Sequence, residues 1–113
     1  VERSRGLGDV YKRQGLFLSG PGFPMARFVL WGTYCQDALE KRTPFRDEHL
    51  SRLHSLKQEG TLVTLGPTEG STHVFGIFEA EELSTVQDLI HADIYWTQGI
   101  WTEVEVYPWI QAF

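Results

Sequence analysis

His49 is the residue whose type and position most suggest chemistry. It lies in residues 46–60, RDEHLSRLHSLKQEG, where Leu53 and Leu56 follow it at helical spacing. At about 100° per residue, both leucines lie within about 40° of His49 on a helical wheel, so the imidazole belongs to the apolar face of a helix. A histidine there is either a core residue with one hydrogen bond, or a proton-transfer group that lines a pocket.

A general-base histidine commonly has a carboxylate on its other ring nitrogen, which fixes the tautomer and raises the basicity of the ring. Residues 25–113 contain thirteen acidic side chains, and the sequence does not choose among them. Arg46, about 60° from His49 on the wheel, is a candidate for binding an anionic substrate or a developing oxyanion. His54 is about 140° from His49, which excludes a zinc-binding couple on one helix face. We expect neither a metal nor a cofactor.

Six segments must position these side chains. Thr43 followed by Pro44 predicts the start of the helix that carries His49, and Gly60 predicts its end. A capping box of Ser84 and Gln87 predicts a second, short helix. Segments rich in β-branched and aromatic residues, or alternating in hydropathy, indicate strands. The expected order is strand 27–35, helix 44–59, strand 61–67, strand 72–80, helix 82–93 and strand 100–109.

This order predicts an α+β fold with the ferredoxin-like βαββαβ pattern. Two helices can cover only one face of a four-stranded sheet, so the other face meets solvent or a second subunit. We expect some of the strand-borne aromatic residues on that second face, and therefore a homodimer. These aromatic residues are Phe28, Trp31, Tyr34, Phe75, Phe78 and Trp101.

Composition and charge exclude several classes of function. Residues 25–113 carry six basic and thirteen acidic side chains, a net charge of −7, which disfavours nucleic-acid binding. No apolar run approaches the roughly 20 residues that span a bilayer. Cys35 is the single cysteine, so an internal disulfide is excluded and a cytoplasmic location is expected.

Residues 1–24 differ in character from the rest of the chain. They show no sustained periodicity, carry four of the ten basic residues, and end in a Gly/Pro cluster before Met25. The stretch 4–14 is typical of a translated sequencing adapter, and its apolar part is too short for a signal peptide. We expect a non-native or disordered leader over 1–24 and one domain over 25–113.

Two longer stretches resemble the YCII-related (YciI-like) family. They are residues 34–67, YCQDALEKRTPFRDEHLSRLHSLKQEGTLVTLGP, and residues 91–109, HADIYWTQGIWTEVEVYPW. The family carries Gln-Asp, Glu-Lys-Arg, an Arg shortly before a His-Leu pair, Gly-Pro after the second strand, Ala-Asp-Pro-Tyr, and Val-x-Val-x-Pro-aromatic. These short motifs occur here in the same order, and the resemblance spans Arg27 to Phe113.

The resemblance implies a dimeric α+β barrel of ferredoxin-like subunits and a His-Asp dyad in a pocket. The matching positions are His49 and Asp93. The family's pocket residues correspond to Arg46, Gly66, Pro67, Ser71 and Tyr95, and more weakly to Asp37 and Arg42.

This chain departs from the family pattern in two places. Ile94 stands where the family usually has proline, so the backbone after Asp93 is less restricted. Only Thr68 and Glu69 separate Gly-Pro from Gly-Ser-Thr, where several relatives have a long loop, so a pocket wall is missing or supplied by another subunit.

These observations predict a small-molecule enzyme in which His49, oriented by Asp93, transfers a proton without a cofactor. Isomerisation, or a lyase reaction such as dehydrochlorination, is the reaction type that the resemblance implies. The ligand is expected to be a small molecule, either anionic or aromatic. The alternatives are a non-catalytic ligand-binding or accessory module of the same fold, and a structural dimer in which His49 only packs in the core.

Overall fold

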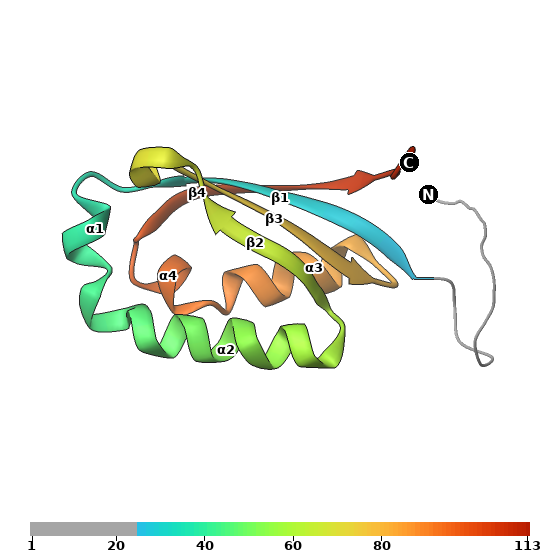
Figure 1. The fold of residues 1–113 in the computed structure, drawn as a ribbon, viewed down its shortest axis with the longest axis horizontal. Helices are drawn as coiled ribbons and strands as arrows, with labels where there is room; N and C mark the ends of the chain where they lie inside the picture. Colours follow the sequence, from blue (N-terminus) through green and yellow to red (C-terminus); the bar gives the residue numbers. More distant parts are fainter. Residues whose placement is uncertain (1–24) are drawn as a thin grey trace.

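The computed structural model describes residues 25–113, and the leader predicted over 1–24 lies outside the described residues. Ten elements follow one another along the chain (Figure 1). They are β1 (Ala26–Tyr34), α1 (Ala38–Lys41), η1 (Thr43–Phe45), α2 (Arg46–Glu59), β2 (Leu62–Pro67), η2 (Glu69–Ser71), β3 (His73–Ala80), α3 (Leu83–His91), α4 (Ile94–Thr97) and β4 (Trp101–Trp109).

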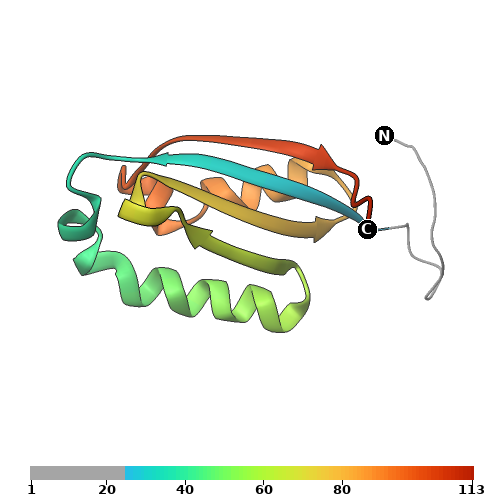
Figure 2. The same cartoon turned by 45° about the horizontal axis from the view of Figure 1, so that its top comes forward.

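The four strands form one antiparallel sheet in the order β2-β3-β1-β4 (Figure 2). α2, α3 and α4 lie on one side of this sheet, with α2 and α3 running along it, and α1 lies at one end (Figure 1). This topology confirms the predicted α+β, ferredoxin-like βαββαβ fold. The described chain has no helix that is long and apolar enough to cross a membrane.

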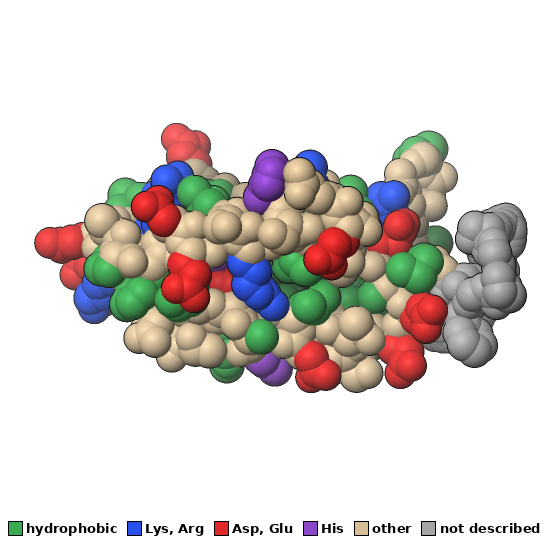
Figure 3. Space-filling model, turned by 90° about the horizontal axis from the view of Figure 1, so that it is seen from below, with side chains coloured by type: hydrophobic (Ala, Val, Ile, Leu, Met, Phe, Trp, Pro, Cys, Tyr) green, Lys and Arg blue, Asp and Glu red, His purple; other side chains and the backbone are tan. Residues whose placement is uncertain are grey.

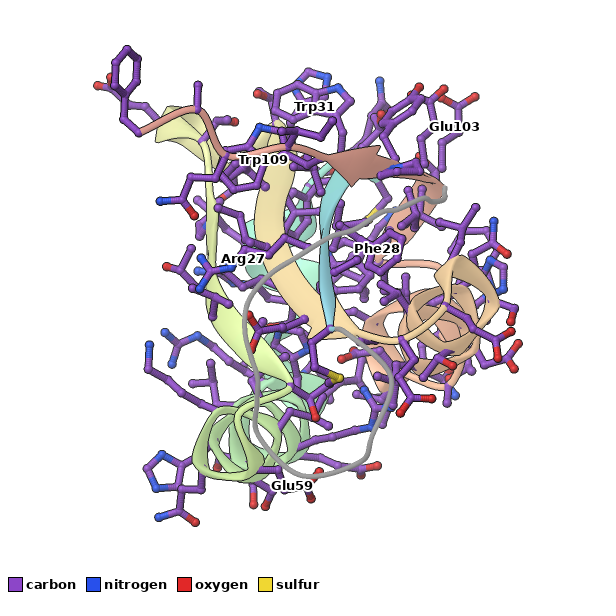
Figure 4. All side chains as sticks on the ribbon, turned by 90° about the vertical axis from the view of Figure 1, so that its right-hand side faces the viewer. Arg27, Phe28, Trp31, Glu59, Glu103 and Trp109 are labelled. Atoms are coloured by element: carbon purple, nitrogen blue, oxygen red, sulfur yellow. The ribbon has the colours of Figure 1, made fainter. Side chains whose placement is uncertain are left out.

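Burial alternates along β1, although its sequence, rich in β-branched and aromatic residues, does not alternate in hydropathy. In β1, Phe28 and Leu30 are buried toward the helices, whereas Trp31 is exposed on the opposite face. Figure 4 shows Phe28 on the helix side of the sheet, and Trp31 and Trp109 on the other side. The face that no helix covers in the described chain therefore carries large aromatic side chains: Trp31, Phe75, Tyr107 and Trp109.

The helix that carries His49 ends as predicted. Gly60 follows α2 with a positive φ of 89°, and its N–H bonds back to the last turn, where a residue without a Cβ is favoured. Along α2, His49 and Leu56 are buried while Asp47 and Ser51 are exposed, as the helical wheel predicts.

Three predicted details of the helices are wrong. The α-helix begins at Arg46, because Pro44 lies in the short 3₁₀ helix η1, and the Thr43 hydroxyl bonds to the carbonyl of Leu39 instead of capping α2. The predicted Ser84 capping box does not form, since α3 begins at Leu83 without a side-chain cap. The connection before Pro44 contains the helix α1, which the sequence did not predict.

A register shift marks the end of β1. Between Thr33 and Tyr34 the pairing with β4 slips, so that Tyr34 lies opposite Trp101. Such irregularities redirect side chains locally. Here Tyr34 and Trp101 are both buried, at the end of the sheet where the aromatic cluster described below forms.

Candidate active site

His49 and Asp93 meet inside the protein, although they are 44 positions apart along the chain. His49 lies in the first turn of α2, and Asp93 lies between α3 and α4. Their residues are 3% and 1% exposed. His49 Nδ1 lies 2.8 Å from Asp93 Oδ1, a distance typical of a hydrogen bond to a carboxylate.

The backbone around Asp93 explains how its carboxylate is aimed. Asp93 is the N-cap residue of α4, with an extended conformation, and its Oδ1 accepts a hydrogen bond of 2.8 Å from the backbone N–H of Tyr95. The same oxygen accepts from His49. The cap geometry therefore orients the carboxylate even though Ile94 replaces the family's proline.

The carboxylate fixes the tautomer of the imidazole. An ionised carboxylate only accepts hydrogen bonds, so Nδ1 of His49 carries the proton and Nε2 holds the free lone pair when the ring is neutral. Within residues 25–113, Nε2 receives no hydrogen bond. The ring thus has its proton-accepting nitrogen free for a ligand.

Aromatic rings enclose the imidazole. The Tyr95 ring stacks on the His49 ring with centroids 3.6 Å apart and planes 6° apart. Trp101 meets the His49 ring edge-on, with centroids 5.4 Å apart. In the described part of the chain, Trp101 Nε1 is the buried side-chain N–H that lacks a hydrogen-bond partner, which normally carries a free-energy cost. The stacking restrains the imidazole to one orientation.

The hydroxyl of Tyr95 lies in an environment of opposing influences. Burial raises the pKa of Tyr95 above its usual 10.0, and the charges of Arg42 and Arg46 lower it in part. Tyr95 is therefore a neutral hydrogen-bond donor at neutral pH. Within the described chain, neither of these arginines forms an ion pair with a carboxylate. Within the described chain, the positive charges that act on Tyr95 are thus not neutralised by ion pairs.

Arg52 contacts the second oxygen of Asp93, and sequence reasoning missed it. Its Nη1 lies 3.3 Å from Asp93 Oδ2, and its Nη2 donates to the carbonyl of Leu89 at 2.8 Å. The signal that could have found it is its spacing, because a residue three positions after His49 lies about 60° from it on the helical wheel.

Figure 3 shows the helix-covered face, on which acidic side chains are spread among few basic ones.

A pocket of about 550 Å³ opens at the end of the molecule where α1 and η2 lie. Ser71 lines it, whereas His49 and Asp93 do not, so the histidine does not itself line this pocket. Tyr34 lines the pocket and meets the Tyr95 ring edge-on, with centroids 6.5 Å apart. A chain of aromatic contacts therefore joins the pocket to His49.

The remaining predicted site residues are spread around this region. Gly66 and Pro67 form the end of β2, where they pair with β3, and they are not part of the pocket lining. Asp37 and Ser71 both line the pocket with left-handed backbone conformations, at φ of 59° and 54°. Such conformations are uncommon for residues other than glycine and often occur at functional sites. Among the described residues, no group of three or more His, Cys, Asp or Glu side chains is arranged to hold a metal ion.

The fold and the site together define a small α+β, ferredoxin-like domain with a buried His–Asp hydrogen bond and a separate pocket, which the Tyr34–Tyr95 contact connects to the histidine. The chain belongs to the YCII-related domain family, whose model matches residues 26–110.

Two bacterial relatives are similar along most of their length. Protein YciI of Escherichia coli O6:H1 is 34% identical over 96 residues, which cover 76% of this chain and 98% of that protein. An uncharacterised protein of Haemophilus influenzae is 30% identical over 96 residues, with the same coverage of both chains.

Two solved structures share the fold. The 5-chloro-2-hydroxyhydroquinone dehydrochlorinase TftG of Burkholderia phenoliruptrix AC1100, in complex with 2,5-dihydroxybenzoquinone, has a TM-score of 0.68 and 24% identity, over 76% of this chain and 95% of its own. A NIPSNAP family protein of Agrobacterium tumefaciens C58 has a TM-score of 0.51 and 10% identity, over 83% and 91%. At these identities the likeness concerns the fold alone.

Proposed function

We propose that this protein is a small-molecule enzyme in which His49, oriented by Asp93, transfers a proton without a cofactor. The single observation that carries the proposal is the 2.8 Å hydrogen bond between the His49 and Asp93 side chains, both almost fully buried. A buried pair of this kind gives the imidazole one tautomer and one orientation, which are the requirements of a general base. Proton transfer by such a group is worth about 10²–10⁴-fold in rate.

The proposed step begins at His49 Nε2. Its lone pair takes a proton from a carbon or hydroxyl group of the substrate, and the imidazolium that results is stabilised by the Asp93 carboxylate. In an isomerisation the same proton returns at another atom. In a lyase reaction the electron pair left behind expels a leaving group such as chloride. TftG, a dehydrochlorinase with this fold, supports the second type by fold analogy.

Arg46 and Tyr95 are the proposed binding groups for an anionic or phenolic oxygen. The Tyr95 hydroxyl is neutral and can donate, and Arg46 contributes positive charge near it. The nearby pocket, whose lining includes neither Arg46 nor Tyr95, has a volume of about 550 Å³, which is sufficient for one aromatic ring with substituents. The proposed substrate-binding set is completed by Ser71, which lines the pocket, and by Gly66 and Pro67, which lie at the end of β2 outside that lining.

The competing function is a ligand-binding or accessory module that keeps the pocket and lacks turnover. The burial of His49 and its absence from the pocket lining favour this second candidate. If it is correct, ligands bind in the pocket without chemical change, and replacement of His49 alters affinity alone.

A homodimer that acts in the cytoplasm is the second part of the proposal. The uncovered face of the sheet exposes Trp31 and Phe75 side by side, each 39% exposed. Exposed aromatic groups of this size on one face commonly mark an interface between subunits. Cys35 as the single cysteine agrees with a reducing compartment.

The experiment is a screen of ring-hydroxylated aromatic compounds, chlorinated hydroquinones and lactones, followed by spectroscopy and product analysis. His49→Ala is expected to abolish turnover, while His54→Ala, an exposed histidine on the same helix, retains it. If a compound binds to both the wild type and His49→Ala and neither protein converts it, the result supports the binding module instead. Turnover that survives in His49→Ala would refute the proposed role of the imidazole.

A further inference from the structure

We propose that Arg52 is a positioning residue of this site, which shares the Asp93 carboxylate with His49 and thereby limits how strongly the imidazole binds a proton. The inference rests on the proposed role of His49 in proton transfer. It assigns a function to a side chain that neither the spacing of the residues nor the resemblance to the family singled out.

The geometry places Arg52 behind the carboxylate. Asp93 Oδ1 accepts from His49, and Asp93 Oδ2 faces Arg52 Nη1 at 3.3 Å. The Asp93 side chain is 2% exposed and that of Arg52 is 29% exposed. The guanidinium therefore reaches inward from the protein surface to a carboxylate that solvent hardly contacts.

A second hydrogen bond fixes the guanidinium in place. Arg52 Nη2 donates to the carbonyl oxygen of Leu89 at 2.8 Å. Leu89 lies in the last turn of α3, where carbonyls lack partners within the helix and favour positive charge. The neighbouring carbonyls of Asp88 and Ile90 accept from backbone N–H groups instead. Arg52 thus joins α2 to the end of α3 and is held at a defined position beside Asp93.

The charges explain why this position matters for proton transfer. With a neutral imidazole, the charges of Asp93 and Arg52 cancel. When His49 takes a proton, the group of three carries one net positive charge, so Arg52 opposes the imidazolium that Asp93 stabilises. The Arg52 charge therefore opposes the protonation of both the imidazole and the carboxylate.

Other titratable groups near the ring must be considered with Arg52. From α4, Tyr95 stacks on the imidazole and is neutral, and from β1, Tyr34 meets Tyr95. Arg42 lies before α2 and Arg46 in its first turn, and the charges of both lower the pKa of Tyr95 in part. Trp101 from β4 carries no charge. In the described chain, Arg52 is the cation that contacts the Asp93 carboxylate directly.

The test follows the protonation of the His49 ring by ¹⁵N NMR, assigned by its loss in His49→Gln, in four proteins. Arg52→Gln removes the charge and keeps a donor for the Leu89 carbonyl. We expect the protonation midpoint of His49 to rise by about half to one pH unit in Arg52→Gln, and to fall in Asp93→Asn. Arg27→Gln is the matched control, because Arg27 pairs with Glu79 at the same 3.3 Å in the sheet, away from His49, and its loss should leave the midpoint unchanged.

A purely structural Arg52 predicts a different result. If Arg52 is purely structural, Arg52→Gln lowers the free energy of unfolding but leaves the protonation midpoint of His49 equal to that in Arg27→Gln. That outcome overturns the proposal. If Arg52→Gln does not fold, as judged by circular dichroism, Arg52→Met replaces it and keeps the apolar stem. A midpoint that rises in a protein without turnover on any screened substrate supports the role of Arg52 and counts against the proposed enzyme, so the two failures are distinguishable.

Discussion

Replacing Asp93 with asparagine changes the charge of the site and almost nothing of its shape. The amide oxygen of the variant can keep both contacts of Oδ1, to His49 Nδ1 and to the Tyr95 backbone N–H, each 2.8 Å in the structure. Neutral hydrogen bonds are about half as strong as those to a carboxylate. The amide NH₂ then faces Arg52 Nη1, 3.3 Å from the replaced oxygen, donor against donor.

These changes give an estimate of the loss of stability. Two weakened buried hydrogen bonds and one lost ion pair amount to about 2–3 kcal/mol in the free energy of unfolding. The loss stays below that of a fully buried ion pair because Arg52 is 29% exposed and can turn toward water. Urea unfolding at pH 7 measures the difference. Turnover, if the protein is an enzyme, should fall by at most about 10²–10⁴-fold, the contribution of proton transfer by His49.

The control is Asp88→Asn, which removes the same charge from an exposed position on α3. Its effect should stay within about 0.5 kcal/mol, as for surface substitutions generally. If Asp93→Asn is no more destabilising than Asp88→Asn, the carboxylate does not hold the imidazole, and the reasoning on the tautomer of His49 is wrong.

Three further predictions concern other parts of the molecule. Folding raises the pKa of Tyr95. The free energy of unfolding should therefore be unaffected by this group below pH 10 and should fall above pH 10, where the tyrosine ionises first in the unfolded chain. Urea titrations at pH 9 and 11 should show this fall in the wild type and a smaller fall in Tyr95→Phe. Gly32→Ala should cost about 1–3 kcal/mol in thermal or urea unfolding, because its new Cβ would lie 2.8 Å from a methyl of Val74, and unchanged stability would contradict this close packing. Trp31→Lys should convert a dimer to a monomer in size-exclusion chromatography with light scattering, and a wild-type protein that is already monomeric would disprove the proposed sheet-face interface.

Much of the fold follows from the local pattern of the residues. β-branched and aromatic residues identify β1 as a strand, and alternating hydropathy identifies β4. Gly60 marks the end of α2 because its conformation suits a residue without a Cβ. The capping box at Ser84 was wrong, since Glu82 precedes the helix in an extended conformation without a side-chain cap. Helix boundaries depend on which of several competing local hydrogen bonds form, so a single residue type predicts them poorly.

For the candidate site, the sequence and its resemblance to the family identified some residues and missed others. The helical wheel correctly placed His49 on the buried face of α2, and the resemblance to the family, not the spacing of residues, singled out Asp93. Arg52 was not predicted because its position beside Asp93 depends on a hydrogen bond to the Leu89 carbonyl of α3. That contact exists only in the folded chain. The pocket was expected beside His49 and lies beyond Tyr34, a separation that the sequence does not express.

The sequence by itself thus determined the order of the four strands and the two longest helices and the face of α2 on which His49 lies, because periodicities of two and 3.6 residues record which side of each element is buried. The tertiary structure alone decided which of thirteen acidic side chains meets the imidazole and which cation meets that carboxylate. The reason is geometric: contacts between residues 44 and 41 positions apart require the rotation and spacing of α2 relative to α3 and α4, and packing of the whole core sets both.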